Sequence, residues 1–322
     1  MTDAAGRDIL ESIRNAADAL AGVAVRTTLL EFPALSARTG VPTWLKCEQE
    51  QPVGAFKARG AYTAIARLSP QKRDAGVVTY SSGNHGQAVA WAAQRLGCRA
   101  VVVMPDSAPR VKVEGVEGWG GEVVWGGPTS ATRRDLAESI AARDGLTIVP
   151  PFDHPDIIAG QGTCTLEILE QCPDLATLVV PVGGGGLLAG ACAVIAALRR
   201  QVRIVAVEPV GAAKLTAALA AGQPVSLQDT TSLADGLLPL AIGSLTFELI
   251  RHTVAEVVQV EDEALAKAVR YLHTQQGLRA EPSGAATTAA LLDGMVAQAG
   301  PVVAIVSGGN VDQDLFQRLV GA

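Results

Sequence analysis

The stretch Leu175–Leu198, LATLVVPVGGGGLLAGACAVIAAL, holds two apolar runs separated by four consecutive glycines and contains no charged residue. The first run has the length of one buried strand, and the second, rich in alanine and leucine, has the length of a buried helix. The whole stretch is long enough to span a bilayer. Because Pro181 and Gly183–Gly186 would break a spanning helix, we predict a buried strand, a glycine loop and a buried helix, and no membrane partner.

The same order of short apolar run, turn and helical stretch recurs along the chain. Apolar runs lie at 76–80, 99–104, 203–207 and 302–306, and helical stretches follow them at 87–96, 111–117, 212–221 and 312–319. Strands that alternate with helices predict βαβ units and parallel sheets. Hydrophobic residues make up 48% of the 322 residues and aromatic residues only 4%, so aliphatic side chains must fill the core.

Composition excludes several classes of function. The net charge is −6 with both signs mixed along the chain, so no nucleic-acid partner is expected. Five scattered cysteines without a CxxC pair, and only four histidines, predict neither a metal cluster nor a disulfide framework. Free thiols and an N-terminus without an apolar signal segment favour the reducing cytoplasm.

Small and polar residues follow three of the predicted strands. They are SSGNH at 81–85, GGGG at 183–186 and SGGN at 307–310. Ligands of parallel α/β sheets bind beyond the carboxyl ends of the strands. Each loop alone could be a simple turn or helix cap, but three such loops together predict one shared pocket.

The glycine loop 183–186 suits a phosphate, because its N–H groups can approach an anion closely at the start of a helix. A dinucleotide is the competing ligand. Gly184, Gly186 and Ala189 fit the nucleotide fingerprint, and Glu208 closes a later strand, where a ribose-binding acid would stand. The dinucleotide interpretation gives no role to Lys57, Asn84 or Ser307.

Lys57 lies in QPVGAFKARGAY, residues 51–62, between Phe56 and Ala58. A desolvated lysine has a lowered pKa and can serve as an amine nucleophile or a base. The alternative is an exposed lysine at a helix start. In the other loops, serine hydroxyls and N–H groups can hold a carboxylate, and Asn84 can bind a phenolic oxygen. His85 lacks a partner in the sequence, and we expect a structural role for it.

In their order and spacing these motifs resemble the fold type II enzymes that use pyridoxal 5′-phosphate (PLP), and within them the serine/threonine dehydratase and serine racemase group. The main motifs are FKARGA at 56–61, SSGNHGQ at 81–87, VGGGGL at 182–187 and SGGN at 307–310. Weaker matches are PDSAPRVK at 105–112, AGQGT at 159–163, ADG at 234–236 and Glu281-Pro282. The resemblance covers nearly the whole chain and disfavours the dinucleotide.

The resemblance implies a role for each site residue. Lys57 would form the Schiff base with PLP, beside Phe56. The other cofactor-binding residues would be Asn84 at the ring hydroxyl, Gly183, Gly184, Gly185 and Gly186 at the phosphate, Gly236 at the cofactor edge and Ser307 at the pyridine nitrogen. The loop of Ser81, Ser82, Gly83, Asn84 and His85 would bind the substrate carboxylate.

The implied activity is that of a lyase. We expect a PLP-dependent dehydratase, or ammonia-lyase, that converts a β-hydroxy amino acid such as L-threonine or L-serine to a 2-keto acid and ammonia, with Lys57 as the base. An amino acid racemase is the main alternative, because racemases of this group carry a serine at the position of Ser82 as the acid on the opposite ring face. A dehydratase of hydroxyaspartate, a β-replacement enzyme and an inactive PLP-binding protein remain as further alternatives.

Two positions depart from the family pattern. Ala55 stands where a serine often precedes the Phe-Lys pair. The racemase group also binds a divalent cation near Glu208 with an acid six residues later, where this chain has Lys214. Lys214 could pair with Glu208 in place of the cation, so we predict no required metal.

The resemblance also implies an architecture of two doubly wound parallel-sheet domains, as in the tryptophan synthase β-like fold. We expect a large PLP-binding domain from residues 1–74 plus 152–322 and a small substrate-loop domain from residues 75–151. A homodimer is expected from the resemblance alone. Because the sequence ends soon after the 307–310 loop, a C-terminal regulatory domain like that of allosteric threonine dehydratases is not expected.

Overall fold

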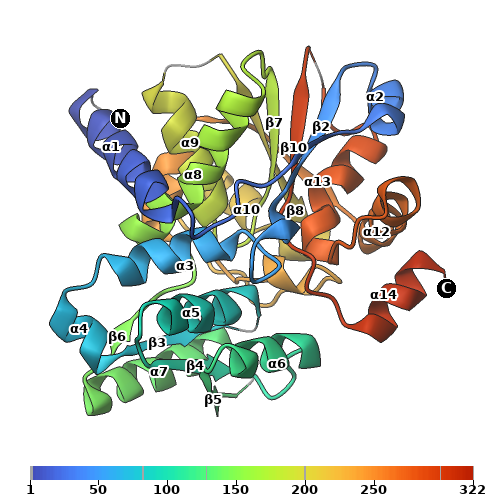
Figure 1. The fold of residues 1–322 in the computed structure, drawn as a ribbon. Helices are drawn as coiled ribbons and strands as arrows, with labels where there is room; N and C mark the ends of the chain where they lie inside the picture. The colour runs from blue at the N-terminus through green and yellow to red at the C-terminus, as the bar shows by residue number, and fades with distance from the viewer. Residues whose placement is uncertain (1–2, 82, 128, 199–200, 298, 322) are drawn as a thin grey trace.

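The computed structural model describes residues 3–81, 83–127, 129–198, 201–297 and 299–321. Two sheets organise the chain (Figure 1). The six-stranded sheet has the order β1-β2-β10-β7-β8-β9, and the four-stranded sheet has the order β5-β4-β3-β6. The strands are β1 (Leu29–Glu31), β2 (Thr43–Cys47), β3 (Val77–Tyr80), β4 (Ala100–Met104), β5 (Glu122–Trp125), β6 (Thr147–Ile148), β7 (Thr177–Pro181), β8 (Arg203–Pro209), β9 (Val254–Val260) and β10 (Val302–Val306).

Helices cover both sheets. The α-helices are α1 (Asp3–Leu20), α2 (Pro33–Thr39), α3 (Lys57–Ala66), α4 (Pro70–Ala75), α5 (Asn84–Arg95), α6 (Arg110–Gly118), α7 (Ser130–Asp144), α8 (Pro155–Gln171), α9 (Gly186–Ala197), α10 (Lys214–Ala221), α11 (Ser244–Ile250), α12 (Asp262–Gln276), α13 (Pro282–Leu292) and α14 (Gln313–Val320). Short 3-10 helices are η1 (Glu48–Glu50), η2 (Val210–Ala212) and η3 (Asp235–Leu237).

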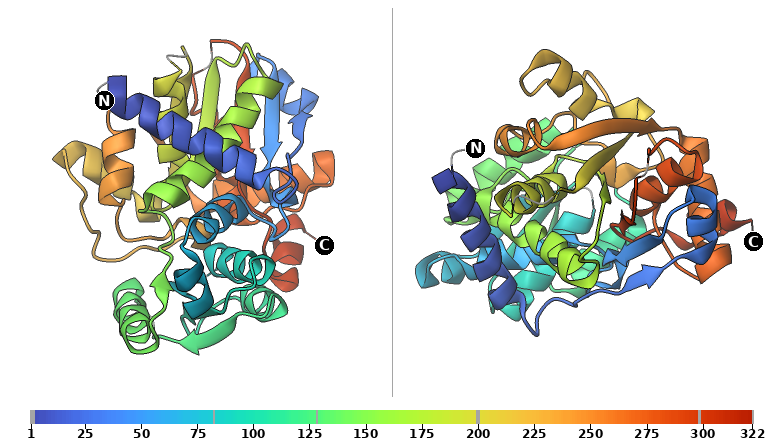
Figure 2. Two further views of the ribbon diagram at one scale, coloured as in Figure 1. Left: turned by 60° about the vertical axis from the view of Figure 1, so that its left-hand side comes forward. Right: turned by 90° about the horizontal axis from the view of Figure 1, so that it is seen from above.

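The large sheet is buried on both faces. Val179, Val205 and Ala304 pack with residues of α12 and α13 in one cluster. Leu178, Val180 and their neighbours pack with α8, α9 and α11 in a second cluster on the opposite face. Figure 2 shows α1 running along the outer side of α8 and α9. Burial on both faces explains why these strands read as continuous apolar runs.

The predicted alternation of strands and helices is confirmed. The strands described along both sheets pair in parallel, except that β1 joins β2 antiparallel at one edge. The stretch 175–198 forms β7, the glycine loop and α9. In the described part of the chain, no helix has the length and apolar character needed to cross a membrane.

The two sheets place the three predicted loops at the carboxyl ends of β3, β7 and β10. β10 is the direct neighbour of β7, with Ala304 opposite Val179, so the Ser307 loop and the glycine loop lie side by side. The loop after β3 comes from the other sheet. Helix α3 packs against α5 on one side and α8 on the other, and so lies between the two sheets (Figure 1).

Candidate active site

The first turn of α3 carries Lys57 and is tied to the loop after β10. The backbone N–H of Phe56 donates to the carbonyl oxygen of Ser307 at 3.0 Å. Ala55 forms an isolated β-bridge with Gly308. The structure therefore joins the lysine turn to the last loop, although 250 positions of sequence separate Lys57 from Ser307.

The Lys57 amine is withdrawn from bulk water. Its Nζ donates to the backbone carbonyl oxygen of Pro151 at 2.7 Å and lies 5.1 Å from the centre of the Phe56 ring. Burial lowers the pKa of Lys57 to about 8. Lys57 is thus half-buried and not fully exposed, and a pKa of about 8 leaves part of its amine neutral near physiological pH.

The glycine loop presents free backbone donors. Gly185 has φ +97°, a left-handed conformation that favours glycine, and α9 begins at Gly186. The carbonyl oxygen of Gly184 is turned away, because it accepts from Gly243 N at 3.3 Å and from Thr246 Oγ1 at 3.0 Å. No hydrogen bond of the described residues uses the N–H groups of Gly183–Gly186. Four unpaired donors at a helix N-terminus fit a phosphate group.

The segment from Pro151 to Asp153 connects the lysine to this loop. A Cβ atom on Gly184 would lie 2.1 Å from Cδ1 of Phe152, so the Phe152 ring needs a glycine there. Asp153 accepts hydrogen bonds at 3.0 Å from the N–H groups of both Ser244 and Thr246 at the start of α11. The sequence did not single out this segment, because its contact to Lys57 is made by a backbone carbonyl.

The loop after β3 leads into α5. The hydroxyl of Ser81 accepts from Gly83 N at 3.1 Å. The N–H groups of Asn84 and His85, in the first turn of α5, have no partner among the hydrogen bonds of the described residues. Ser82, the predicted acid on the opposite ring face, lies outside the described residues. The described part of this loop offers donors that a carboxylate could accept from.

The side chain of Asn84 is held by the side chains of Glu281 and Asn310. Its Nδ2 donates to Glu281 Oε1. Its Oδ1 accepts from Asn310 Nδ2 at 2.9 Å. Asn310 Nδ2 also donates to Val53 O at 2.8 Å. The amide is therefore fixed in orientation, and one N–H of Nδ2 remains for a ligand.

His85 is a buried, neutral imidazole. Its Nε2 lies 3.1 Å from the carbonyl oxygen of Val149, which requires the proton on Nε2. Burial, and then the charge of Lys57, lower the pKa of His85 to about 3. An imidazole that stays neutral and is held by the backbone fits the structural role expected for it.

Ser307 and Gly236 meet around Ser283. The Ser307 hydroxyl lies 3.5 Å from the carbonyl oxygen of Ser283, a weak contact that leaves the hydroxyl available. Gly236 N donates to Ser283 Oγ at 2.9 Å. A Cβ atom on Gly183 would lie 3.0 Å from Gly236 O. The structure thus brings together Lys57, the glycine loop, Gly236 and Ser307.

An ion triad of buried Lys112 and Glu281 with partly exposed Asp235 closes one side of the site. Lys112 Nζ lies 2.6 Å from Asp235 Oδ2 and 3.1 Å from Glu281 Oε2. The Lys112 stem packs under the substrate loop, because a Cβ atom on Gly83 would lie 2.7 Å from Lys112 Cδ. The three residues occur in weakly matching sequence motifs, but the sequence assigned them no role.

Glu208 and Lys214 form a second buried pair. Glu208 accepts from Leu215 N and Thr216 N, both at 2.9 Å, and from Thr216 Oγ1 at 2.7 Å. Lys214 Nζ lies 3.8 Å from Glu208 Oε2. It donates to Ala212 O at 2.8 Å and to Leu237 O at 2.9 Å. Glu208 is thus occupied as the cap of α10 and is not presented to a ribose.

Comparison with known proteins agrees with this geometry. Residues 21–308 match the family model for pyridoxal-phosphate dependent enzymes. The chain is 39% identical to an L-threonine ammonia-lyase of Thermotoga maritima, over 97% of this chain and 78% of that protein. It is 37% identical to a serine racemase of Oryza sativa, over 96% of this chain and 94% of that protein. A structure of maize serine racemase superposes with a TM-score of 0.92 at 36% identity, covering 96% of this chain and 95% of that one.

The residues present fit the cofactor of this family. The free N–H groups of Gly183–Gly186 suit its phosphate, and the desolvated amine of Lys57 suits its aldehyde. The cofactor is therefore pyridoxal 5′-phosphate, as the sequence predicted. The chain belongs to the pyridoxal-phosphate dependent enzymes, and within them to the fold type II group that contains threonine dehydratases and serine racemases.

Proposed function

We propose that the protein is a PLP-dependent dehydratase that converts a small β-hydroxy amino acid, such as L-threonine or L-serine, to a 2-keto acid and ammonia. The observation that carries the proposal is the Lys57 amine, which bonds Pro151 O next to the residue that packs on the glycine loop and whose pKa burial lowers to about 8. An amine with this pKa can be neutral at working pH and accept a proton from a substrate carbon. The similarity to an L-threonine ammonia-lyase supports the same activity.

Each side of the site would hold one part of the cofactor. The N–H groups of Gly183–Gly186 would bind the phosphate, and Phe56 would pack beside the ring. The free N–H of Asn84 would reach the ring hydroxyl, Gly236 would border the cofactor edge, and the Ser307 hydroxyl would bind the pyridine nitrogen. When bound, the cofactor supplies a conjugated ring that stabilises negative charge on the α-carbon of an amino acid.

The chain's own groups would then select and activate the substrate. The N–H groups of Asn84 and His85, which make no hydrogen bond with the described residues, would hold the substrate carboxylate, together with Ser81, Ser82 and Gly83. Lys57 Nζ would remove the α-proton as a positioned base. Because Ser307 is neutral, the ring would be a weaker electron sink than it would be with an aspartate at the pyridine nitrogen, which favours loss of the β-hydroxyl over transamination.

Amino acid racemisation is the second candidate. Lys57 and Ser82 are both present in the sequence, as a two-base mechanism requires. The relatives also include serine racemases. The two activities differ in one step, namely whether the α-carbon takes up a proton on the opposite face before the β-hydroxyl leaves.

The deciding experiment incubates the purified holoenzyme with L-serine and measures pyruvate, ammonia and D-serine separately. We expect pyruvate and ammonia in equal amounts, with D-serine as a minor product. D-serine as the main product would replace the proposal with racemisation. A panel of L-threonine, L-serine and hydroxyaspartate, scored by ammonia release, would identify the substrate side chain. The Ser82→Ala variant should lose racemisation and keep elimination.

We further propose that Lys214 takes the place of a divalent cation, so that no metal is required. Its ammonium lies among two backbone carbonyl oxygens and the Glu208 carboxylate, which are the oxygen ligands that such cations prefer. Burial lowers the pKa of Lys214 to about 8, the charge of Glu208 opposing this, so the ammonium persists at neutral pH.

We also propose that residues 1–74 plus 152–322 and residues 75–151 move as two domains. Closure of the smaller one would exclude water from the site and align the substrate with Lys57. A homodimer is proposed as the working form.

A further inference from the structure

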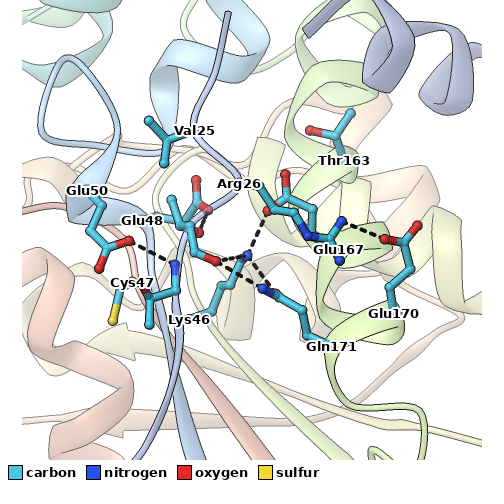
Figure 3. A network of polar contacts seen from close by, with 12 residues as sticks. Val25, Arg26, Lys46, Cys47, Glu48, Glu50, Thr163, Glu167, Glu170 and Gln171 are labelled. Carbon is cyan, nitrogen blue, oxygen red and sulfur yellow. Dashed lines mark hydrogen bonds and ion pairs between the residues drawn. The ribbon is translucent and has the colours of Figure 1, made fainter. Parts of the chain in front are cut away.

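Arg59 follows Lys57 by two residues in α3, and its side chain is 1% exposed. It forms ion pairs with Glu48 and Glu167, and Glu167 also pairs with Lys46. Figure 3 shows these three partners of the network. None of these four residues has a role in the proposed chemistry. A buried charged network next to the cofactor-bearing lysine therefore calls for its own explanation.

The guanidinium of Arg59 binds two carboxylates at once. Nε and Nη2 each donate to Glu48 at 2.8 Å. Nη1 and Nη2 donate to Glu167 at 2.7 and 2.9 Å. Nη1 also reaches Thr163 Oγ1 at 3.2 Å, and Nη2 reaches Val25 O at 3.3 Å. The planar fork of arginine makes such paired contacts directional, and the single ammonium of a lysine cannot reproduce them.

The network is balanced in charge. Lys46 Nζ donates to Glu167 Oε2 at 2.7 Å, to Gln171 Oε1 at 2.9 Å and to Thr27 O at 2.9 Å (Figure 3). Burial would raise the pKa of Glu48, but the charge and hydrogen bonds of Arg59 outweigh it and lower that pKa. Two cations thus meet two anions. Buried ion pairs contribute little net stability compared with apolar packing, so their directional geometry is the more informative property.

The residues that Arg59 binds belong to different elements. Glu48 lies in η1, directly after β2, and Glu167 lies on α8. Helices α3 and α8 also touch without intervening side chains. A Cβ atom on Gly160 would lie 2.5 Å from the carbonyl oxygen of Arg59 and 2.6 Å from Cα of Gly60. Arg59 therefore fixes α3 at the place where its backbone meets α8.

Helix α8 passes this constraint on to the glycine loop. A Cβ atom on Gly190 of α9 would lie 2.6 Å from the N atom of Gly162 in α8. Helix α9 begins at Gly186, inside the loop that would hold the phosphate. Close backbone contacts thus run from α3 through α8 to α9, and they connect the helix of Lys57 with the helix of the glycine loop.

Among the described residues, the start of α3 has no side-chain cap, and its bond to Pro151 O is made by the reactive Lys57 amine itself. Its N-cap residue, Phe56, makes no side-chain capping hydrogen bond. Ahead of Lys57 the chain is fixed by the bond from Phe56 N to Ser307 O. After Lys57 it is fixed by the side chain of Arg59.

We infer that Arg59 is a positioning residue, whose hold on Glu48 and Glu167 sets the place of the Lys57 amine relative to the glycine loop. The inference rests on the proposed role of Lys57 as the lysine that carries the cofactor. In this inference the network aligns the Lys57 amine with the glycine loop, in addition to its contribution to folding.

The test compares Arg59→Lys with Arg67→Lys in the holoenzyme. Arg67 is the C-cap of the same helix and also binds α8, through Asp156 at 2.6 Å, but at a partly exposed site. For each variant one measures kcat, KM, the visible spectrum of the bound cofactor, the Kd for PLP and the thermal unfolding midpoint.

We expect Arg59→Lys to lower kcat about 10- to 100-fold, the cost of a small misplacement of a reacting group, with KM changed far less. The visible band of the cofactor should shift or weaken, and the Kd for PLP should rise. Arg67→Lys should leave kcat, the spectrum and the Kd within about twofold, because an exposed pair contributes little. A folded Arg59→Lys variant with a lower unfolding midpoint but unchanged spectrum, Kd and kcat would overturn the inference.

Two further arms keep the test decisive. If Arg59→Lys does not fold, Glu167→Gln weakens the same clamp from a partly exposed position and should show the same spectral shift and rise in Kd; unchanged values would reject the inference. If the wild-type protein binds PLP but turns over no β-hydroxy amino acid, the proposed function fails. The spectrum and the Kd would then still decide the role of Arg59.

Discussion

The Nζ atom of Lys57 donates a hydrogen bond to the backbone carbonyl oxygen of Pro151 at 2.7 Å. The next residue, Phe152, places its ring where a side chain on Gly184 would stand. One short segment therefore contacts both the amine and the glycine loop. Since Pro151 offers only a neutral carbonyl, the amine gains no opposite charge there, and burial dominates its pKa.

The first prediction concerns how pH controls PLP uptake. An amine must be neutral to attack the cofactor aldehyde. Because the pKa of Lys57 is lowered to about 8 from 10.5, the neutral fraction grows as pH rises through about 8. The rate at which the apoprotein takes up PLP, followed by visible absorbance, should rise with pH and be half-maximal near 8. A midpoint near the ordinary lysine value would show that Lys57 is solvated.

The second prediction removes the amine. Lys57→Ala should lose the yellow colour of the bound cofactor and all turnover, because the change removes both the attachment point and the base. Lys72→Ala, which changes an exposed lysine in α4, should keep both. Visible absorbance and ammonia release measure the two effects, and circular dichroism confirms folding. Turnover that survives in Lys57→Ala would contradict the proposed mechanism.

The third prediction concerns the triad below the substrate loop. Burial would lower the pKa of Lys112, but Glu281 and Asp235 raise it, so Lys112 stays charged. Lys112→Met should cost about 3–5 kcal/mol of unfolding free energy, because Glu281 would keep a buried carboxylate without its cation. Urea denaturation measures the loss.

Two variants serve as controls for the triad. The double variant Lys112→Met/Glu281→Gln should lose less stability than Lys112→Met alone, since the uncompensated carboxylate is gone. Lys267→Met breaks an exposed pair with Asp293 and should cost less than about 1 kcal/mol. Equal losses from Lys112→Met and Lys267→Met would show that the triad is not desolvated.

Local patterns were enough to predict most of the fold. The runs before 81, 183 and 307 became β3, β7 and β10, because buried parallel strands are apolar along their whole length. The glycine loop was also predicted from the sequence, since four glycines before a helix leave free N–H groups that suit a phosphate. The antiparallel edge strand β1 was not foreseen, because its three residues are too short for a periodic pattern.

The polar networks of the site could not be read from the sequence. Lys112 meets Asp235 across 123 positions, and Asn84 meets Asn310 across 226. Such contacts depend on how the two sheets lie together, and neighbouring residues carry no sign of them. The acceptor of the Lys57 amine is a backbone carbonyl, which has no signature in the residue type of Pro151.

A fourth prediction tests the crowding at the glycine loop. Gly184→Ala should raise the Kd for PLP by about tenfold or more, because the new methyl group would overlap the Phe152 ring and displace the loop. Gly118→Ala is the matched control, since no atom lies within 4 Å of its added Cβ and its φ is not left-handed. Titration with PLP compares the two variants. A Kd unchanged in Gly184→Ala would show that the loop adapts without cost.

A fifth prediction concerns the ammonium of Lys214, which joins Ala212 O, Leu237 O and Glu208. Because Leu237 follows Gly236, this contact ties the end of β8 to the proposed cofactor edge. Wild-type activity should survive dialysis against EDTA, since the internal ammonium needs no replacement. Lys214→Asp exchanges the cation for a second carboxylate beside Glu208, so it should lose activity in EDTA and regain part of it with Mg²⁺. Wild-type activity that collapses in EDTA and returns with Mg²⁺ would mean that a metal, and not Lys214, fills this role.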